Sequence, residues 1–519
     1  KKYSIMKKNK NQLDAIIIGS GIGGLVTATQ LASKGAKVLV LEKYIIPGGS
    51  GGSFKRKGYT FDVGASMIFG FGENGYTNLL TRALKDVNEK CETIPDPVQL
   101  EYHLPNEINL SVDKNYFDFI NKLTDRFPHE REGIKKFYGA CRKVFNCLDS
   151  MPLLSIEDPT YLFKVFIKAP LSCLGLARWL PINAGDVARK FIKDPELLKF
   201  IDIECFCWSV MPALKTPMIN AGMVFTDRHV GGINYPKGGV GTIAEKLVKG
   251  LEKLGSKIRY KANVQEIIIK RNHAIGVKLT NGEELFAKTI ISNSTRWDTF
   301  GLSNVQNGLV KKEFVSKKEY VWSKNYKPSP SFVSIHIGVN DNIINTNFNC
   351  HHIIVDKWEE LEDEKGVIFI SIPTLLDKNL APEGKHIVHA FTPSTMNEWE
   401  NLSRKEYLKK KEEYFEFIIN KISKIIPEIK YSIDHKEIGT PKTHKKFLGR
   451  YDGSYGPIPN KKLLGLLPMP FNTTNIKNLY CVGDSCFPGQ GLNAVAFSGY
   501  ACAHKVGSQL KINSIKLPN

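Results

Sequence analysis

An α/β fold is predicted by three features of this 519-residue sequence. A strand, a glycine-rich turn, a helix and a second strand follow one another between Asp14 and Glu42. Near the other end, the stretch "GDSCFPGQGLNAVAFSG" at Gly483–Gly499 is typical of a small-residue turn that leads into a helix. Between these ends, amphipathic helix patterns and alternating strand patterns occur in turn. A chain of this length is expected to form two or three domains.

The first motif is "DAIIIGSGIGGLVTATQLASKGAKVLVLE". Ala15–Ile18 and Val38–Leu41 are continuous apolar runs, typical of buried parallel strands. Glycines between them form a GxGxxG pattern, in which the first allows a tight turn, the second lets backbone approach a pyrophosphate and the third lets helix and strand pack closely. These glycines are Gly19, Gly21 and Gly24. Glu42 then closes the second strand and can accept hydrogen bonds from ribose hydroxyls. The order of these parts predicts a Rossmann-type dinucleotide site.

Two further stretches favour FAD over NAD. Gly48 and Gly49, in "PGGSGGSFKRKGYTFDVGAS", resemble the second fingerprint of the glutathione-reductase-type FAD families. "NLYCVGDSCFPGQGLNAVAFSG" resembles their C-terminal flavin segment, with Gly483 and Asp484 after a strand over Leu479–Val482. Asp484 is expected to bind the ribityl chain. The following helix start should present N–H groups to the N1/C2=O edge of the flavin, which favours the anionic reduced form. The residues of this helix start are Gly491, Leu492 and Asn493.

The middle of the chain supplies the remaining parts of this domain. A glycine turn and an amphipathic helix are predicted for Ile233–Gly255, and the strands that follow include a hairpin signal at Asn281-Gly282. Val264 occupies the position at which related flavoproteins hold the adenine by a strand backbone, and Ile290–Ser292 is typical of a strand that returns to the sheet. The FAD-binding domain is therefore expected over 12–85, 230–300 and 436–510. A mixed α+β substrate domain is expected to be inserted as 86–229, which also docks on a membrane, and 301–435. Within it, Ser403-x-x-Glu406 predicts a capping box at the start of a core helix whose apolar face begins at Leu408.

One stretch of the substrate domain, Tyr161–Ile182, is apolar and aromatic but is interrupted by cations and by Pro170. It is too interrupted to span a bilayer. Two compatible interpretations remain open. The stretch lies in a membrane interface, with its cations reaching head groups, or it forms a helix pair that roofs a substrate cavity. The side chains expected to insert into a membrane are Leu171, Leu174 and Leu176.

Composition and charge limit the function classes. The formal net charge of +20 is compatible with an anionic membrane surface or with a lysine-rich composition that has no partner. The sequence contains no basic helix with interleaved aromatic residues, so nucleic-acid binding is not predicted. The ten cysteines and twelve histidines show no metal-ligand spacing, so no metal site is predicted. The N-terminal residues lack the apolar core of a signal peptide, and no apolar run reaches about 18 residues. A peripheral membrane protein on the cytoplasmic or stromal side is expected, with no signal or transit peptide in this chain.

From Asp14 to Val506 the chain resembles the carotenoid cis-trans isomerases, a branch of the phytoene-desaturase-like flavoproteins. The most specific stretches are "PGGSGGSFKRKGYTFDVGASMIFGFG", "GGINYPKGGVG", "GTPKTHKKFLGRYDGSYGPIP" and "GDSCFPGQGLNAVAFSG". The Thr440–Pro459 segment, with its run Thr443–Phe447, is what points to the isomerase branch. The resemblance implies poly-cis lycopene as substrate, all-trans lycopene as product, reduced FAD without net redox change, and NAD(P)H as an indirect electron source. Plastid relatives carry a transit peptide that is not expected in this chain, a departure that predicts a bacterial-type or mature form.

The sequence assigns no catalytic side chain. Asp227 and His229, in "TDRHVGG", are conceivable proton donors, but an ordinary surface loop is the favoured interpretation. A carotenoid desaturase or polyene saturase would share the fold and the cofactor. A lipid-escort protein of the GDP-dissociation-inhibitor type would share the fold without flavin. The oligomeric state and the double bonds that isomerise are not indicated by the sequence.

Overall fold

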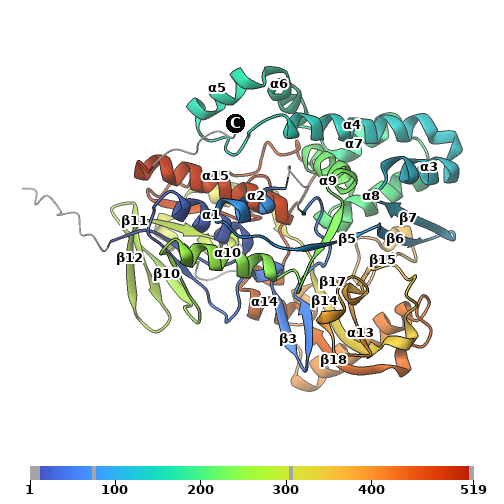
Figure 1. The fold of residues 1–519 in the computed structure, drawn as a ribbon. Helices are drawn as coiled ribbons and strands as arrows, with labels where there is room; N and C mark the ends of the chain where they lie inside the picture. Colours follow the sequence, from blue (N-terminus) through green and yellow to red (C-terminus); the bar gives the residue numbers. More distant parts are fainter. Residues whose placement is uncertain (1–11, 73–77, 303–307, 513–519) are drawn as a thin grey trace, which may run out of the picture.

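A computed structural model describes residues 12–72, 78–302 and 308–512 (Figure 1). Its first sheet contains the strands predicted for the dinucleotide site. In spatial order they are β10 (Val264–Lys270), β11 (His273–Leu279), β12 (Glu284–Ser292), β1 (Leu13–Ile18), β2 (Val38–Leu41) and β9 (Lys257–Arg259), with β20 (Leu479–Cys481) paired to the far part of β12. β1, β2, β9, β12 and β20 pair in parallel, whereas β10, β11 and β12 form an antiparallel meander. Strands from both ends of the chain therefore flank β12.

Helices from both ends of the chain also pack together over this sheet (Figure 1). They are α1 (Ile22–Ser33) and α15 (Leu492–Leu510), with α10 (Thr242–Lys253) beside α1. Ala28 and Leu31 share an apolar core with Ala503 and Val506. A Cβ atom on Gly499 would lie 2.8 Å from the carbonyl oxygen of Gly23, so the two helices can approach this closely only because glycine stands there.

The second sheet is mostly antiparallel and belongs to the region between the dinucleotide-binding segments. Its strands, in spatial order, are β18 (Ile433–Gly439), β14 (Ser331–Asn340), β17 (Lys385–Ser394), β16 (Ile368–Ser371), β15 (His351–Ile354), β6 (Val98–Leu104) and β7 (Ile108–Asp113). Helix α13 (Arg404–Ile422) shares a core with this sheet and begins with the predicted Ser403–Glu406 capping box. Leu408 is not part of that core: it is 45% exposed, because the buried face of α13 begins only at Tyr414.

A group of helices lies at the top of the view in Figure 1. They are α3 (Tyr116–Arg126), α4 (Arg131–Asp149), α5 (Pro159–Lys168), α6 (Pro170–Trp179), α7 (Ala184–Phe191), α8 (Pro195–Ser209) and α9 (Met218–Val230). In this view α5 and α6 lie above α15, and the others lie toward the second sheet. The chain bends by 116° between α5 and α6. Among the described residues no single helix has the length and apolarity to cross a membrane, and the bent α5–α6 pair meets that test only when its two helices are taken together. The expectation of a surface loop at Asp227–His229 is wrong, because these residues form the last turn of α9.

Short elements join the two sheets. Two-stranded ribbons are formed by β3 (Ser53–Arg56) with β4 (Tyr59–Asp62), β5 (Thr93–Asp96) with β8 (Ile233–Pro236), and β13 (Tyr326–Pro328) with β19 (Pro457–Pro459). The remaining helices are α2 (Leu79–Asp86), α11 (Arg296–Phe300), α12 (Lys317–Asn325) and α14 (Pro441–Leu448). All strands of the first sheet come from segments 12–85, 230–300 and 436–510, whereas β18 of the second sheet crosses the expected boundary at 435/436.

Candidate cofactor and substrate cavity

A single continuous cavity of about 1010 Å³ is lined by residues of both sheets and of the helical group. Almost every residue predicted for the cofactor site lies in its wall. These residues are Gly19, Gly21, Glu42, Gly48, Gly49, Val264, Gly483, Asp484, Gly491, Leu492 and Asn493. Gly24 lies behind the wall, where a Cβ atom would be only 2.5 Å from the carbonyl oxygen of Gly19. That position suits the helix–strand packing expected of the third glycine.

The first end of the cavity is formed by the N-terminus of α1. The helix begins directly after Gly21, and no side chain caps its first N–H groups. A Cβ atom on Gly21 would lie 2.7 Å from Nδ2 of Asn293, which follows β12. Asn293 also lines the cavity, although the sequence reasoning did not select it. Free N–H groups at a helix start favour a bound phosphate.

Glu42 is held firmly at this end. Its Oε2 accepts hydrogen bonds from the backbone N–H (2.9 Å) and the hydroxyl (2.5 Å) of Ser20, and its Oε1 accepts one from the N–H of Tyr44 at 2.7 Å. The Gly48 N–H donates to the carbonyl of Ser20 at 2.9 Å, which ties the second glycine fingerprint to the first. The two fingerprints therefore form one surface.

The C-terminal motif meets the N-terminal one here. A Cβ atom on Gly23 would lie 3.2 Å from Cα of Gly483. Helix α15 begins after Gly491, again without a side-chain cap on its first N–H groups. The side chain of Asn493 is already bound by the protein: its Oδ1 accepts a hydrogen bond from the N–H of Leu79 at 2.8 Å. Two uncapped helix starts thus face the same cavity.

Asp484 forms an ion pair with Arg450, a residue that sequence reasoning missed. Arg450 follows α14, and both belong to the Thr440–Pro459 segment that carries the family resemblance. From α14, Thr443, His444 and Phe447 also line the cavity. The ring of Phe447 lies 5.1 Å from that of Tyr44, next to Glu42. The specific segment of the sequence is therefore part of the cavity wall.

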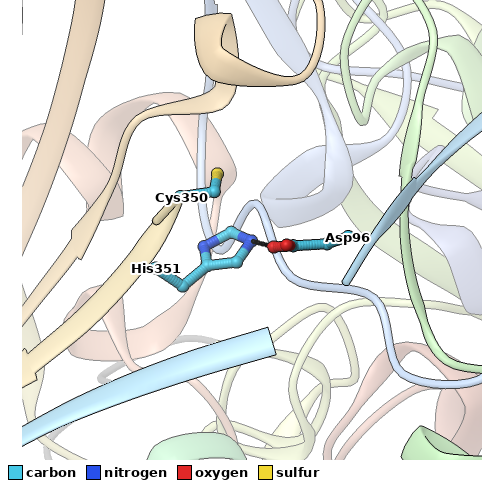
Figure 2. Close-up of side chains that lie close together, drawn as sticks. All are labelled: Asp96, Cys350 and His351. Carbon is cyan, nitrogen blue, oxygen red and sulfur yellow. Dashed lines mark ion pairs between the residues drawn. The ribbon is translucent and has the colours of Figure 1, made fainter. Parts of the chain in front are cut away.

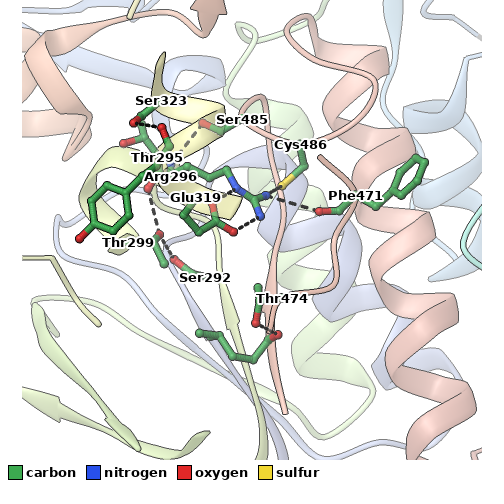
Figure 3. A network of polar contacts seen from close by, with 12 residues as sticks. Ser292, Thr295, Arg296, Thr299, Glu319, Ser323, Phe471, Thr474, Ser485 and Cys486 are labelled. Carbon is green, nitrogen blue, oxygen red and sulfur yellow. Dashed lines mark hydrogen bonds and ion pairs between the residues drawn. The ribbon is translucent and has the colours of Figure 1, made fainter. Parts of the chain in front are cut away.

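A buried network supports the loop that follows Asp484 (Figure 3). The Arg296 guanidinium donates two hydrogen bonds of 2.9 Å to the Glu319 carboxylate. Its third nitrogen lies 3.3 Å from Sγ of Cys486, and its backbone N–H lies 3.4 Å from the hydroxyl oxygen of Ser485. A paired, bidentate arginine is a rigid support. Sequence reasoning did not select Arg296 or Glu319, because no sequence motif marks an ion pair between residues on different elements.

The far end of the cavity is apolar. Its wall is contributed by α4, α5, α6, α8 and α9 and by the chain after them. Residues of this wall include Leu148, Met151, Leu154, Leu162, Leu176, Leu180, Ile219, Met223, Phe332, Phe391, Leu466 and Phe487. No pattern in the sequence selects these residues from other core positions, because apolarity alone does not distinguish a cavity wall from a packed interior.

Three buried histidines also line the cavity. His336 on β14 and His389 on β17 stack as a cross-strand pair with ring centroids 4.2 Å apart. Burial lowers the pKa of His336 to about 4 and that of His444 to about 3. Within the described residues, neither ring nitrogen of His389 has a hydrogen-bond partner. These imidazoles are neutral near pH 7 and can donate or accept a hydrogen bond.

Asp227 and His229 are not part of the cavity wall, which supports leaving them without a catalytic role. His229 has its Nε2 3.2 Å from Nε of Arg228 and its Nδ1 3.0 Å from the carbonyl of Lys114. Burial and the neighbouring Arg228 lower the pKa of His229 to about 3. It is therefore uncharged near pH 7, with its one N–H directed at the Lys114 carbonyl and its other nitrogen accepting from Arg228.

Residues 22–506 match the protein family described as "Flavin containing amine oxidoreductase". "Prolycopene isomerase, chloroplastic" from Daucus carota is 57% identical over 501 residues, which cover 96% of this chain and 80% of the relative. Its counterpart from Arabidopsis thaliana is 56% identical over 499 residues, which cover 96% and 83%. The chain belongs to the prolycopene isomerase family. Cyclohexylamine oxidase from Brevibacterium oxydans has a TM-score of 0.61 at 12% identity, covering 96% of this chain and 100% of that one, a likeness that shows the fold alone.

Membership in the prolycopene isomerase family confirms the predicted resemblance and the FAD-type Rossmann fold with an inserted substrate domain. The family also makes a flavin, FAD, the cofactor. The cavity fits FAD on observations of its own. Glu42 is fixed at one end, glycines line the middle, and the uncapped starts of α1 and α15 face inward. An elongated dinucleotide with a central pyrophosphate needs such a surface.

Proposed function

We propose that this protein converts poly-cis lycopene to all-trans lycopene, with FAD in its reduced form and no net redox change. The observation that carries the proposal is one cavity with a glycine-lined cofactor end and an apolar end, in a chain 57% identical to a prolycopene isomerase. The apolar end suits a hydrocarbon chain, which gains about 25 cal/mol for each Å² of surface removed from water.

The residues of the cofactor end are proposed to hold FAD as follows. Glu42 accepts from the ribose, Val264 holds the adenine by its backbone, and Asp484, oriented by Arg450, binds the ribityl chain. The backbone donors of Gly491–Asn493 face the flavin N1/C2=O edge and stabilise its negative charge. The glycines that admit the pyrophosphate and close the turns are Gly19, Gly21, Gly24, Gly48, Gly49 and Gly483.

Rotation about a C=C bond requires its bond order to fall. The chemistry that bound, reduced FAD would supply is the reversible loan of an electron or a proton to the polyene, which would lower that bond order without net redox change. The apolar wall orients the polyene and excludes water. NAD(P)H is proposed only as an indirect electron source. The sequence contains two GxGxxG matches, at Gly19–Gly24 and Gly70–Gly75, and within the described residues only the first directly follows a parallel strand and opens a helix, as a dinucleotide site requires.

The test is an anaerobic assay in which FAD is reduced once and the reductant is then removed. We expect many turnovers per flavin on poly-cis lycopene, with a product of unchanged mass and an all-trans absorption spectrum. A desaturase would need oxidised flavin and give a product two hydrogens lighter per step. A saturase would stop after one turnover with a product two hydrogens heavier, and a colourless purified protein would favour a lipid escort. Each of these outcomes contradicts the proposal.

We further propose that α5 and α6 attach the protein to a membrane surface. Their outer side exposes Phe163, Ile167, Leu171 and Leu174, of which Leu171 is 83% and Leu174 60% exposed. Leu464 and Leu467 extend this patch, since the neighbouring Leu466 N–H donates to the carbonyl of Leu180 after α6. Leu162 and Leu176, on the same two helices, line the cavity. One helix pair thus connects an apolar surface with the apolar cavity, which suits a substrate that partitions into lipid.

Flotation with anionic vesicles tests this attachment. Replacing Leu171 and Leu174 with Ser should weaken flotation, whereas Leu408→Ser on the distant α13 should not. High salt should release only part of the protein, because screening removes the charge contribution and leaves the apolar one. Leu176, the third side chain expected to insert, is only 9% exposed and faces the cavity, so it is left out of this variant. Complete release by salt, or unchanged flotation of the double variant, would contradict attachment through these helices.

The division of the chain into FAD-binding segments 12–85, 230–300 and 436–510 and substrate segments 86–229 and 301–435 is part of the same proposal. So is a peripheral location on the cytoplasmic or stromal side of a membrane. The names of the carrot and Arabidopsis relatives place those proteins in the chloroplast. Fractionation of intact cells with antibody detection would test the location.

A further inference from the structure

Asp96, Cys350 and His351 converge where the end of β5 meets the start of β15 (Figure 2). The carboxylate oxygen, the sulfur and the ring nitrogen that these side chains offer all lie within 4.8 Å of one another. All three residues are buried, and none of them lines the cofactor and substrate cavity. The cluster is therefore a separate feature of the molecule.

Two atoms of this cluster lack any hydrogen-bond partner within the described residues. They are Oδ2 of Asp96 and Nε2 of His351, which lie 3.7 Å apart, too far for a hydrogen bond between them. Their side chains are only 5% and 1% exposed, so solvent does not replace the missing partners. Buried polar atoms in native proteins are normally satisfied, and such a pair calls for a bound group.

We propose that Asp96, Cys350 and His351 bind a zinc ion. Thiolate, imidazole and carboxylate together form a ligand set of Zn²⁺, whereas Mg²⁺ and Ca²⁺ prefer oxygen alone. Tetrahedral zinc, with bonds of about 2.0–2.2 Å to oxygen and nitrogen, holds two such ligand atoms about 3.3–3.5 Å apart. The distance of 3.7 Å between Oδ2 of Asp96 and Nε2 of His351 is slightly longer, so a small approach of the two side chains completes the geometry. One thiolate and one carboxylate neutralise the ion, which reduces the cost of burying charge.

The other ring nitrogen of His351 is already placed for this role. Its Nδ1 lies 2.9 Å from the hydroxyl oxygen of Ser371 on β16. Ligating histidines commonly use the second nitrogen in this way, which fixes the orientation of the ring. Three protein ligands leave the fourth position of the ion to a water molecule.

A neighbouring cluster of similar composition provides the contrast. Glu101, His103 and His352 also place potential ligand atoms within 4.8 Å of one another. There, however, Nδ1 of His352 lies 3.0 Å from Nε2 of His103, and its Nε2 lies 2.8 Å from the carbonyl oxygen of Asn349. Both nitrogens of His352 are thus satisfied by the protein. The proposal concerns the first cluster only.

The ion would join the β5–β8 ribbon to the second sheet. β8 leads directly into the turn at Gly238–Gly241, where the N–H of Gly241 donates to the hydroxyl of Ser53 at 2.8 Å, beside the second glycine fingerprint. The site is structural and lies outside the reaction cavity. Sequence spacing did not predict it because Asp96 lies on a different element, far along the chain from Cys350 and His351.

Zinc binding is measured on the full-length holoprotein, prepared without a histidine tag, by elemental analysis and by titration against a chromophoric chelator. We expect one equivalent of Zn²⁺ in the wild type and in His352→Gln, and affinity at least about 100-fold lower in His351→Gln. Added Zn²⁺ should raise the melting temperature of the first two proteins and not of the third. Equal binding by the two histidine variants, or no equivalent in the wild type, would overturn the proposal.

Cobalt provides a second readout that does not depend on the stability of His351→Gln. Co²⁺ in the wild type should give a thiolate-to-metal absorption band, and Cys350→Ser should lose it while keeping its flavin. Asp96→Asn should weaken Co²⁺ binding and leave the far-ultraviolet circular dichroism unchanged. A cobalt band that persists in Cys350→Ser would show that another cysteine is the ligand and would contradict the assignment.

Discussion

At the cofactor end of the cavity the wall is mainly backbone, whereas at the substrate end it is side chains. Glycines and two uncapped helix starts form the first, together with two acids that the protein holds in place, Glu42 and Asp484. The second is formed by apolar side chains of five helices and by histidine side chains of the second sheet and of α14. A pyrophosphate is recognised by N–H groups, which any sequence offers if its backbone can come close, and only glycine permits that approach. A hydrocarbon is recognised by shape, which many side-chain sets can provide.

The largest effect is expected at the cofactor end, from Glu42→Arg. The new cation would face the N–H groups of Ser20 and Tyr44, which now donate to the carboxylate. Loss of charge-assisted hydrogen bonds of about 1.5–3 kcal/mol, with added repulsion, should remove most of the flavin. Flavin absorbance per protein in the purified variant measures this. Glu42→Gln is the matched control and should bind FAD about 10-fold more weakly than the wild type, since neutral hydrogen bonds are about half as strong. Full retention of flavin by Glu42→Arg would show that Glu42 does not hold FAD.

A smaller effect is expected from Gly24→Ala, which tests whether backbone approach limits this end. The added methyl would lie 2.5 Å from the carbonyl oxygen of Gly19, an atom that cannot move without displacing the fingerprint. We expect a loss of about 1–3 kcal/mol in the free energy of unfolding, with weaker FAD binding. Gly139→Ala, on α4, meets nothing within 4 Å and should be neutral or stabilise by up to about 1 kcal/mol. Denaturant titration of both variants measures the difference, and equal stabilities would contradict the packing argument.

The smallest effect concerns the substrate end. Burial holds the pKa of His389 well below its usual value of about 6.5. Below pH 6.5 the unfolded chain therefore binds a proton that the folded protein does not, and this contribution to stability falls as the pH falls. Between pH 7.5 and 5.5 the loss for one such group is about 1.4 kcal/mol. When the pH falls from 7.5 to 5.5, the free energy of unfolding of His389→Phe should therefore decrease by about 1.4 kcal/mol less than that of the wild type.

Thermal or denaturant unfolding at the two pH values measures the difference. Phe also removes two buried nitrogens that have no hydrogen-bond partner within the described residues, so the variant should be no less stable than the wild type at pH 7.5. An identical pH dependence in the two proteins would mean that His389 does not remain neutral in the fold.

The contrast between the ends explains what the sequence could predict. Strands β1, β2 and β20, helices α1 and α15 and the cavity-lining positions of the cofactor residues follow from motifs in which each glycine has a geometric reason. Arg450, Asn293 and the Arg296–Glu319 pair could not be predicted, because their partners lie on elements distant in sequence. The sequence also could not tell that Leu176 is buried at the cavity while Leu171 is exposed. Both are leucines of the same short helix, α6, and about one turn separates them. The Thr443–Phe447 run marked the segment that contains His444, but nothing in the sequence predicted the contacts of His444 with Tyr455 and Ser334.

The meeting of Gly23 with Gly483, and the place of β20 beside β12, have a consequence for biosynthesis. Ribosomes deliver the chain from one end, so β1, β2 and β12 are complete long before β20 and α15 emerge. Until then β12 keeps an open edge, and the groove for the pyrophosphate lacks one of its walls. Such an edge is prone to wrong pairing during synthesis. The groove can therefore close only after β20 and α15 have been synthesised, and a chain that stops before residue 479 would lack both elements.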